Sequence, residues 1–538
     1  MSGVGKGVAS ASIGKILQSK GFNLTAVKID PYVNVDAGTM NPTEHGEVFV
    51  LDDGTECDQD MGNYERFLNI DLTGINYMTT GSVYQTVINR ERNLGYGGKC
   101  VEVVPHIPLE ILSRIDKAAI KNNADIIITE IGGTVGEYQN VLFLEAIRML
   151  KLKKSADVAL VLVSFLPFQN KDSELKTKPT QYAVRALNST GLQPDMILAR
   201  AHVSLDRKRK DKIAFNCGMK EEDIISAPDI KSIYEVPINF EKDKLSEVVL
   251  RKLGLKTKVK DLKKWTAWVA SIKKATKPIT IGIVGKYFNT GDFVLTDSYI
   301  SVLEAVKHAA ALLGRKPEIE WLNAEDFDPT LNKSYKKTLK KLKKYNGIIV
   351  PGGFGERGIE GKIAVIKYLR ENKIPYFGLC YGMQIAVIEF ARSILGLGGA
   401  NTTEIDQNSP HPVIDVMPEQ KKNLALKNYG ATMRLGIYPA VLKKNTIAYS
   451  AYKKYLVSER HRHRYEVNPL YIEKLEKAGL IFSGFSSDKK LMEISELSRK
   501  EHPFFLGTQF HPEFKSRPLA PHPLFVEFLK AGLNRNSQ

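Results

Sequence analysis

The chain has 538 residues, of which 43% are apolar and 25% charged, and its formal net charge is +17. This length suffices for more than one domain, and the composition is typical of a globular protein rather than of a disordered or fibrous one. No apolar stretch approaches the ~20 residues that a membrane-spanning helix needs, and no signal peptide opens the chain. We therefore expect no membrane association.

The cysteines and lysines further restrict the class of protein and its expected binding partners. The four cysteines lie far apart and form no Cys-x-x-Cys pair: Cys57, Cys100, Cys217 and Cys380. This spacing argues against a zinc site or a disulfide scaffold and favours a reducing, cytoplasmic location. The lysines are dispersed in short runs, and the run at 335–345 is typical of the solvated face of an amphipathic helix. No aromatic-interleaved RNA-binding motif accompanies them, so we expect small polyphosphates rather than nucleic acid as the acidic partner.

The N-terminus contains a candidate phosphate-binding loop. Residues 2–7 read Ser-Gly-Val-Gly-Lys-Gly, which is similar to the second half of a P-loop. In such a loop backbone N–H groups and one lysine bind phosphates at the start of a helix. The helical spacing of Ile13, Ile16 and Leu17 supports a helix there. A glycine-rich disordered start is the alternative.

An acidic segment follows a predicted strand at 25–30. Within nine residues it carries five carboxylates: Asp52, Asp53, Glu56, Asp58 and Asp60. Such a density of negative charge is unfavourable unless the groups are solvated or meet a cation. A solvated loop and Mg²⁺ ligation by one of these groups both remain open.

The next predicted strand, at 125–130, delivers Glu130 to a glycine-rich turn at 132–136. This is the Walker-B arrangement, in which the carboxylate holds a metal or polarises a water molecule. Apolar runs at 158–163, 197–199 and 224–229 alternate with helical segments. This alternation predicts a parallel, doubly wound α/β sheet over 1–240. The lysine-rich residues from about 254 to 277 are typical of a linker with one short helix.

Residues 176–181 read Lys-Thr-Lys-Pro-Thr-Gln. Two lysines, two hydroxyls and an amide around a proline turn can bind an anion and the edge of a base. An ordinary loop could contain the same residues, but the density of polar groups favours a nucleoside triphosphate site.

A second α/β domain begins with the apolar strand 279–285 and an amphipathic helix at 297–312. A strand at 347–350 leads into the glycine-rich residues 351–358, whose backbone N–H groups could stabilise an oxyanion. Downstream, the apolar run 374–377 leads into a turn around Cys380, and a helical pattern follows. A cysteine at a helix N-terminus is favoured as thiolate, although this stretch alone is equally consistent with a buried structural cysteine.

His511 and Glu513 lie two residues apart at the end of a predicted strand. Together with Cys380 and the loop near Gly353 they supply a base, an orienting carboxylate, a nucleophile and an oxyanion stabiliser. Their joint presence in one domain favours covalent catalysis by Cys380. The triad is similar to that of class I glutamine amidotransferases.

Motifs along essentially the whole chain resemble those of the CTP synthase family. In the first half they lie at 5–7, 28–34, 45–50, 62–67, 132–136, 176–181 and 232–234. In the second half they lie at 351–355, 380–384, 430–436, 459–468, 511–518 and 521–525. Several of these strings are long enough to be specific to the family.

The resemblance implies an α/β protein with a P-loop-type parallel-sheet synthetase domain at 1–254, a linker at 255–277 and a class I glutamine amidotransferase domain at 278–538. It implies ATP-dependent amination of UTP to CTP with ammonia that is released from L-glutamine and channelled between the domains. It further implies Mg²⁺ with ATP, GTP as allosteric activator, CTP as feedback inhibitor and a homotetramer.

In the second domain the resemblance implies that Cys380 is the nucleophile, His511 the base and Glu513 its orienting group. Glutamine-binding positions of the family match Gly353, Tyr381, Gly382, Met383, Gln384, Glu404 and Arg464. Arg357 matches a position in a GTP lid.

In the first domain the implied metal ligands are Asp60 and Glu130. The ATP-binding positions match Gly3, Val4, Gly5, Lys6, Gly7, Val8, Lys28, Asp60, Pro228, Asp229 and Ile230. The UTP- and CTP-binding positions match Ser2, Glu137, Tyr138, Gln139, Lys176, Thr177, Lys178, Pro179, Thr180, Gln181 and Lys212.

The sequence departs from the family at two places. The family has a strand and the first glycines of the P-loop before the position of Ser2, so we expect a misplaced or truncated start, a damaged ATP site and an unpaired position in the sheet. After Gly136 the family has an acidic-aliphatic-acidic stretch, whereas residues 137–140 read Glu-Tyr-Gln-Asn. We therefore expect altered inhibition by CTP.

Two other classes of function remain. A different P-loop ligase fused to an amidotransferase would share the triad and the P-loop but lack residues 176–181. A non-catalytic nucleotide-sensing or filament-forming protein would tolerate the loss of Cys380, His511 or Glu513, and all three are present.

Overall fold

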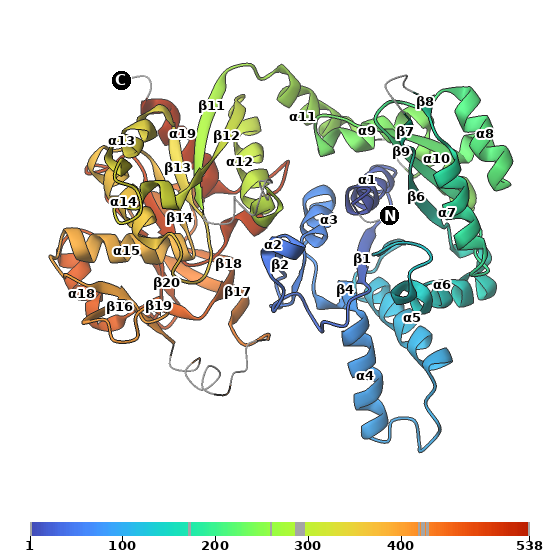
Figure 1. Ribbon diagram of the computed structural model, residues 1–538, viewed down its shortest axis with the longest axis horizontal. Coiled ribbons are helices and arrows are strands. Elements are labelled where there is room, and N and C mark those ends of the chain that lie inside the picture. The colour runs from blue at the N-terminus through green and yellow to red at the C-terminus, as the bar shows by residue number, and fades with distance from the viewer. Residues whose placement is uncertain are drawn as a thin grey trace. The chain divides into compact units, whose positions relative to one another are not determined.

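The computed structural model describes residues 3–169, 174–258, 261–285, 296–417, 420, 426 and 430–535. The chain forms two compact units (Figure 1). Unit 1 comprises Met1–Asp36 and Asn63–Val269, and unit 2 comprises Ala37–Gly62 and Ala270–Gln538. Residues 37–62 therefore group with the second half of the chain, although they precede most of the first.

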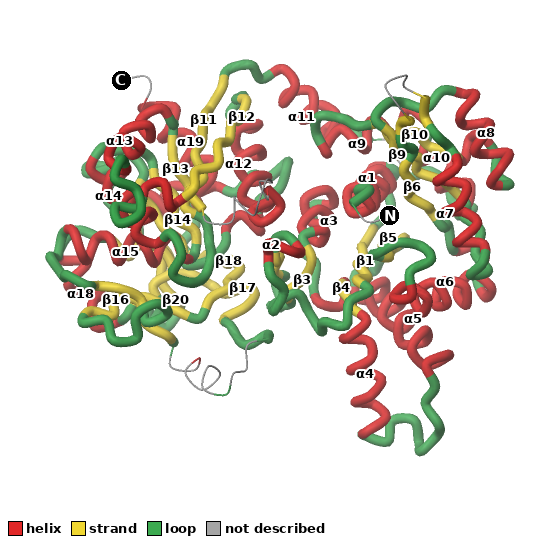
Figure 2. The backbone as a smooth tube through the Cα atoms, in the orientation of Figure 1, coloured by secondary structure: helices red, strands yellow, loops and turns green. Residues whose placement is uncertain are grey.

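Unit 1 contains two parallel sheets, each of three strands, with the orders β4-β1-β5 and β10-β9-β6 (Figure 2). Their bounds are β1 (Leu24–Asp30), β4 (Tyr77–Thr79), β5 (Ile126–Ile131), β6 (Val161–Phe165), β9 (Met196–Ala201) and β10 (Ile224–Pro228). A short antiparallel pair joins β7 (Phe168–Gln169) to β8 (Glu174–Leu175). The parallel α/β fold predicted for the first half of the chain is confirmed.

The helices of unit 1 begin with one that precedes β1, and the others lie between or after the strands. They are α1 (Lys6–Ser19), α4 (Thr80–Arg92), α5 (Val103–Lys121), α6 (Val141–Lys153), α7 (Lys178–Asn188), α8 (Arg207–Cys217), α9 (Val236–Phe240) and α10 (Leu245–Lys252). Two helices, α3 (Asp60–Leu68) and α11 (Lys263–Lys274), include residues of both units. The predicted apolar stripe of α1, which includes Ile16 and Leu17, is buried against Leu198 and Ile225 of the second sheet.

Unit 2 is built on a nine-stranded sheet with the order β12-β11-β13-β14-β22-β21-β20-β17-β18. The first five strands in this order are parallel and the remaining pairs are antiparallel. Their bounds are β11 (Pro278–Gly285), β12 (Lys316–Asn323), β13 (Gly347–Val350), β14 (Tyr376–Leu379), β17 (Arg434–Leu442), β18 (Leu456–His463), β20 (Ile481–Ser486), β21 (Met492–Glu496) and β22 (Phe505–Thr508). A second sheet contains β15 (Ala400–Thr402), β16 (His411–Val416) and β19 (Tyr465–Val467).

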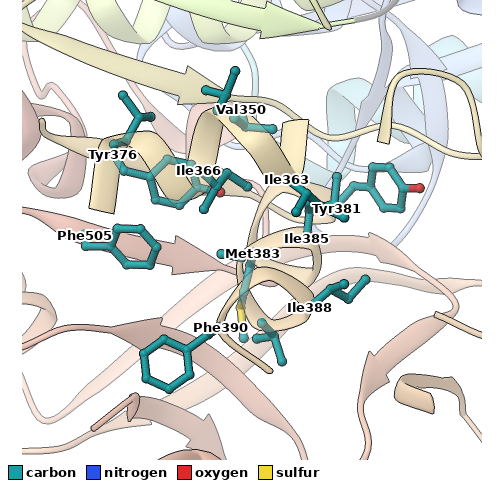
Figure 3. Close-up of a cluster of buried hydrophobic side chains, with 14 of the residues drawn as sticks. Val350, Ile363, Ile366, Tyr376, Tyr381, Met383, Ile385, Ile388, Phe390 and Phe505 are labelled. Atoms are coloured by element: carbon teal, nitrogen blue, oxygen red, sulfur yellow. The ribbon is translucent and has the colours of Figure 1, made fainter. Parts of the chain in front are cut away.

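Each face of the large sheet carries a core because side chains alternate along its buried strands. Ile348 and Val350 lie in one core with Tyr376, whereas Ile349 and Phe377 lie in the other. Figure 3 shows part of the first core, with Met383, Ile385 and Ile388 of one helix directed into it. The helices are α2 (Pro42–His45), α12 (Ile300–Leu312), α13 (Tyr335–Lys340), α14 (Ile359–Glu371), α15 (Tyr381–Ser393), α17 (Ile447–Tyr452), α18 (Pro469–Lys477) and α19 (Pro523–Arg535).

Two predicted helices are shorter than their sequence patterns. The segment predicted as helix from 297 starts with a 3-10 turn at Thr296–Tyr299 before α12, and the lysine-rich 335–345 changes from α13 to a 3-10 turn at Lys341–Lys344. Among the helices of the described ranges, none combines the length and apolar character needed to cross a bilayer.

The segment 37–62 contributes a hairpin to unit 2. Its strands β2 (Val48–Val50) and β3 (Glu56–Asp58) pair antiparallel, and Val50 lies opposite Glu56. The hairpin is buried at Phe49, Val50 and Cys57. Its strands therefore pack into the unit, whereas its carboxylates range from the buried Glu56 through the half-buried Asp52 and Asp58 to the exposed Asp53.

Candidate functional site

Cys380 occupies a sharp turn between β14 and α15. Its φ of 50° and ψ of −99° are strained for a residue with a side chain. A Cβ at Gly382 would lie 2.2 Å from the carbonyl oxygen of Val350, and one at Gly378 would lie 2.4 Å from the hydroxyl of Tyr376. Glycine at both positions lets α15 start against the neighbouring strand, so the turn presents Cys380 at the helix N-terminus.

The thiol of Cys380 is 4% exposed and is surrounded by polar groups. Its Sγ lies 3.7 Å from the carbonyl oxygen of Arg462, and the Gln509 amide donates to Sγ over 3.6 Å. The free N–H groups and dipole at the start of α15 add to this environment. The Gln509 amide and the N–H groups of α15 are donors that a reacting sulfur can use, whereas the Arg462 carbonyl can only accept a hydrogen bond from the thiol.

His511 faces Cys380 and is held by Glu513. The Nδ1 of His511 lies 2.7 Å from Oε1 of Glu513, and its ring stacks on Phe514 with centroids 5.0 Å apart. Burial acts to lower the pKa of His511, but the charges of Glu513 and Cys380 and hydrogen bonds to both raise that pKa to about 10. The geometry therefore favours an imidazolium beside Cys380, with the carboxylate orienting the ring.

The glycine-rich loop 351–358 passes close to this pair. A Cβ at Gly352 would lie 2.9 Å from Cε1 of His511 and 3.7 Å from Cβ of Cys380. The loop is fastened because the Gly355 N–H donates to Glu404 Oε1 over 2.7 Å and the Tyr381 hydroxyl donates to the Gly355 carbonyl over 2.9 Å. Its backbone N–H groups, which include that of Gly353, can thus serve a negatively charged oxygen near Cys380.

The remaining predicted glutamine-binding residues differ in how their side chains lie. Arg464 donates to Gln420 over 2.7 Å and to Thr432 over 2.8 Å. Gln384 donates to the carbonyl of Tyr465 over 2.9 Å. The side chain of Met383 lies inside the core (Figure 3), so only its backbone is available to a ligand. Arg357, which was matched to a GTP lid rather than to the glutamine site, is exposed and donates to Glu325 over 2.5 Å.

Several predicted nucleotide-binding residues of unit 1 lie near the carboxyl ends of parallel strands, where α/β sheets bind ligands. The glycine turn 132–136 follows β5, while Pro228 ends β10 and residues 229–230 follow it. The Lys176 N–H donates to the carbonyl of Pro167, just beyond β6, over 3.0 Å. Lys212 lies instead on the exposed surface of α8.

The described part of the P-loop-like stretch leads directly into α1. Gly3 and Gly5 have φ angles of 71° and 80°, and Gly5 precedes the first helical residue, Lys6. The Lys6 ammonium donates to the carbonyl of Gly133 over 2.9 Å. Of the other residues predicted here, Val4 and Gly7 are buried and Val8 is half-buried. Ser2, predicted to contact UTP and CTP, lies outside the described residues.

A buried charge cluster joins β1 to β5. Lys28 lies opposite Glu130 in the parallel register, and its ammonium is 3.0 Å from Glu130 Oε1 and 3.6 Å from Asp30 Oδ1. The Tyr64 hydroxyl donates to the other oxygen of Glu130. The buried Asp30 Oδ2 has no hydrogen-bond partner within the described ranges. Asp30 and Tyr64 were not predicted as site residues, although both lie within the strings 28–34 and 62–67.

Asp60, the other predicted metal ligand, is the first residue of α3, and its N–H donates to Asp58 Oδ1 over 2.7 Å. Asp60 belongs to unit 2 and Glu130 to unit 1. Within the described residues, no group of three or more histidine, cysteine, aspartate or glutamate side chains is arranged to hold a metal ion.

The residues predicted to bind UTP and CTP divide into two local structures. Glu137 accepts from the Thr134 N–H over 2.9 Å and from Gln139 over 3.1 Å, while Tyr138 is 97% exposed. Residues 176–181 lead into and start α7, with Pro179 in its first turn. The two threonines, Thr177 and Thr180, are buried, whereas Lys178 and Pro179 are exposed and Lys176 and Gln181 are half-buried.

Among the predicted ATP-binding residues at the end of β10, Asp229 accepts from His202 over 2.6 Å and from Arg200 over 2.8 Å. These hydrogen bonds, that from His202 first, lower the pKa of Asp229. Pro228 is buried and Ile230 is half-buried. The cluster presents an ionised carboxylate and an exposed histidine beside the end of β10.

Comparison with known proteins matches both halves of the chain. Residues 1–255 match the family model described as "CTP synthase N-terminus", and residues 294–531 match "Glutamine amidotransferase class-I". A CTP synthase of Caldanaerobacter subterraneus is 49% identical over 99% of this chain and 97% of its own length. A CTP synthase of Pyrococcus abyssi is 50% identical over 99% of this chain and 96% of its own length.

One similar solved structure is the Trypanosoma brucei CTPS glutaminase domain with bound acivicin, which is 37% identical in sequence. The match covers 48% of the present chain and 94% of the solved chain, with a TM-score of 0.43. The match of residues 294–531 to the family model makes the second half of the chain a class I glutamine amidotransferase unit, and it is joined to a parallel α/β unit. The two CTP synthases share about half of their residues with this chain, and each match spans nearly the whole of this chain and of the relative. The chain therefore belongs to the CTP synthase family. The family and the fold expected from the sequence are confirmed.

Proposed function

We propose that this protein converts UTP to CTP with glutamine as nitrogen donor and ATP as the source of activation. The observation that carries the proposal is the identity of 49% to a CTP synthase over 99% of the chain. The division of labour follows the expected domains, with the synthetase step in 1–254, a linker at 255–277 and glutamine hydrolysis in 278–538.

Glutamine hydrolysis is assigned to Cys380, His511 and Glu513. The Cys380 thiolate attacks the carboxamide carbon of glutamine, and the oxyanion accepts hydrogen bonds from backbone N–H groups near Gly353. His511 then protonates the departing nitrogen, so that the C–N bond breaks and ammonia leaves a glutamyl thioester. Water attacks this thioester, which releases glutamate and restores the thiolate.

Glutamine recognition is assigned to residues around the same turn. Glu404 and Arg464 carry charges opposite to those of the α-amino and α-carboxylate groups of glutamine. Backbone groups of residues 381–384 complete the pocket, and the Tyr381 hydroxyl holds the loop at Gly355.

The synthetase step is assigned to unit 1 and Asp60. ATP transfers its γ-phosphoryl group to O4 of the uracil of UTP, which turns that oxygen into a phosphate leaving group. Ammonia from the second domain then attacks C4, phosphate departs and CTP forms. Lys6 and Lys28 hold the ATP phosphates, and residues 176–181 hold UTP at the N-terminus of α7, where N–H groups favour anions.

Mg²⁺ would be held by Asp60 and Glu130 together with phosphate oxygens of ATP. The oxygen donors fit this ion, and Asp30, whose buried Oδ2 has no hydrogen-bond partner among the residues that the structure describes, shares the Lys28 ammonium with Glu130. When bound, Mg²⁺ neutralises charge on the transferring phosphoryl group.

Regulation and assembly are proposed on the resemblance alone. GTP would activate through a lid near Arg357, CTP would inhibit, and the enzyme would be a homotetramer. The replacement of the family's second carboxylate by Gln139 would alter inhibition by CTP. A CTP titration against UTP turnover tests the last point, and inhibition of ordinary strength would contradict it.

The decisive experiment measures CTP formation from UTP and ATP with either glutamine or ammonia. Cys380→Ala should abolish the glutamine-dependent activity and keep the ammonia-dependent one. If both activities vanish, the assignment of Cys380 is wrong. If the wild-type protein forms no CTP from either nitrogen source, the proposed function is wrong.

A further inference from the structure

The string 459–468, which includes Arg-His-Arg-His-Arg at 460–464, contributes only Arg464 to the proposed mechanism. Residues 456–463 form β18, an edge strand of the large sheet. Side chains alternate along a strand, so Arg460 and Arg462 project from one face while His461 and His463 project from the other. The two faces of β18 have different partners.

The backbone of β18 touches both members of the candidate catalytic pair. The N–H of His511 donates to the carbonyl oxygen of Arg460 over 2.8 Å, and Cys380 Sγ lies 3.7 Å from the carbonyl oxygen of Arg462. Carbonyls two residues apart along a strand point to the same side. One edge of β18 therefore contacts the nucleophile and the base at adjacent sites.

The two arginines are fixed by carboxylates of the hairpin formed by β2 and β3. Arg460 Nε lies 2.5 Å from Asp52 Oδ1, and Arg462 Nε lies 2.7 Å from Glu56 Oε1. The side chain of Arg460 is fully buried and that of Glu56 is 1% exposed. Removing one partner of such a pair leaves a buried charge without compensation, so the pairs hold β18 firmly against the hairpin.

Aromatic contacts connect the hairpin to His511 by a second route. The ring of Phe49, in β2, meets the ring of Phe514 edge-on with centroids 4.9 Å apart. Phe514 is the ring on which His511 stacks. The Arg460 guanidinium lies 5.4 Å from the centroid of Phe49. The hairpin thus supports the base through Phe49 and Phe514 as well as through the strand.

The opposite face of β18 is held by a buried polar network. His461 Nδ1 and His463 Nε2 are 3.0 Å apart, and Arg434 donates to Glu493 over 2.8 Å. Burial and the charge of Arg434 lower the pKa of both histidines. A neutral pair of histidines can share one hydrogen bond, so this face is fixed without adding charge to the core.

We propose that the hairpin of β2 and β3 is a structural part of the glutamine-hydrolysing site, in which Phe49, Asp52 and Glu56 are positioning residues. They fix the edge of β18 and with it the placement of Cys380 against His511. The inference rests on the proposed roles of those two residues. Because the hairpin comes from the first 62 residues of the chain, glutamine hydrolysis depends on a segment outside the predicted amidotransferase domain.

The test uses the full-length protein and the variants Asp52→Asn, Glu56→Gln and Phe49→Leu. Each should lower kcat for glutamate release from glutamine by about tenfold or more, since small displacements of reacting groups are costly, and leave KM for glutamine within about twofold. Ammonia-dependent CTP formation should stay within about twofold of the wild type. Asp52→Glu, which retains the charge, should retain more activity than Asp52→Asn.

The matched control is Glu473→Gln, which removes a carboxylate from the exposed pair with Lys477 on α18 and should change neither activity. Glutamate release that stays within about twofold of the wild type in Asp52→Asn and Glu56→Gln would overturn the inference. So would a parallel loss of glutamine- and ammonia-dependent activities, because it would indicate general unfolding. If the proposed function is wrong, the wild-type protein itself forms no CTP. If only this inference is wrong, the wild-type protein is active and the variants release glutamate at nearly the wild-type rate.

Discussion

His511 Nδ1 lies 2.7 Å from Glu513 Oε1, and both side chains are nearly inaccessible to solvent. A buried carboxylate next to a buried imidazole fixes the tautomer and the orientation of the ring. It also stabilises the imidazolium that forms beside a thiolate. The relationship leads to two predictions, one on activity and one on stability.

Glu513→Gln should lower glutamine-dependent CTP formation by about 10²-fold or more, because the amide neither orients His511 nor stabilises its charge. The ammonia-dependent reaction should be retained, since it needs no thiolate. Steady-state rates with each nitrogen donor measure both effects. A variant that keeps full glutamine-dependent activity would exclude Glu513 as the orienting group.

The raised pKa of His511 predicts a pH-dependent stability. Its pKa rises from 6.5 to about 10 on folding, so protonated His511 contributes stability that is fully present below pH 6.5 and is lost as the pH rises through about 10. Wild-type protein should therefore exceed Glu513→Gln in free energy of unfolding by more at about pH 6 than at about pH 10. Denaturant unfolding at both values measures the difference, and a constant difference would contradict the prediction.

The close packing of the turn at Cys380 leaves no room for a side chain at Gly382. Gly382→Ala should destabilise the protein by about 1–3 kcal/mol or more, because the new methyl group would lie 2.2 Å from a backbone oxygen. Gly398→Ala is the control, since a Cβ there meets nothing within 4 Å. Thermal unfolding compares the two variants, and equal melting temperatures would show that the turn relaxes around the methyl group.

The buried pair of Lys28 and Glu130 predicts a role in the synthetase step. Lys28→Met should abolish CTP formation from both nitrogen donors while glutamate release persists, because the change removes a positive charge from the proposed phosphate site. It should also cost about 3–5 kcal/mol of stability, because the buried Glu130 carboxylate loses the ammonium that lies beside it. Lys258→Met, which breaks an exposed pair with Asp125, is the control. CTP formation by Lys28→Met at the wild-type rate would contradict the assignment.

The N-terminus of α7 predicts a UTP contact. Lys178→Ala should raise KM for UTP by about tenfold, since an exposed lysine there can pair with a phosphate, and should leave glutamate release unchanged. Lys153→Ala, at the exposed end of α6, serves as the comparison. An unchanged KM for UTP in Lys178→Ala would remove this lysine from the site.

The sequence predicted most local elements because their patterns are local. The apolar stripe of α1, the strand that ends at Asp30 and the turn around Cys380 depend on residues within a few positions of one another. Glycines near Cys380 indicate that the backbone there packs closely against neighbouring atoms. Only the structure identifies these neighbours, which include the carbonyl oxygen of Val350 next to Gly382. Helix ends were less well predicted, as at 296–299, where a 3-10 turn precedes α12.

The partners of the carboxylates in the acidic segment 52–60 could not be predicted from the local sequence pattern. Its carboxylates allowed a solvated loop or a metal site, yet Asp52 and Glu56 pair with Arg460 and Arg462, about 400 residues away. The sequence by itself determined the family, the turn that presents Cys380 and the strings that carry each candidate site. Only the tertiary structure decided that a hairpin from the first 62 residues supports the amidotransferase site, because partners of buried charges are chosen by proximity in space rather than along the chain.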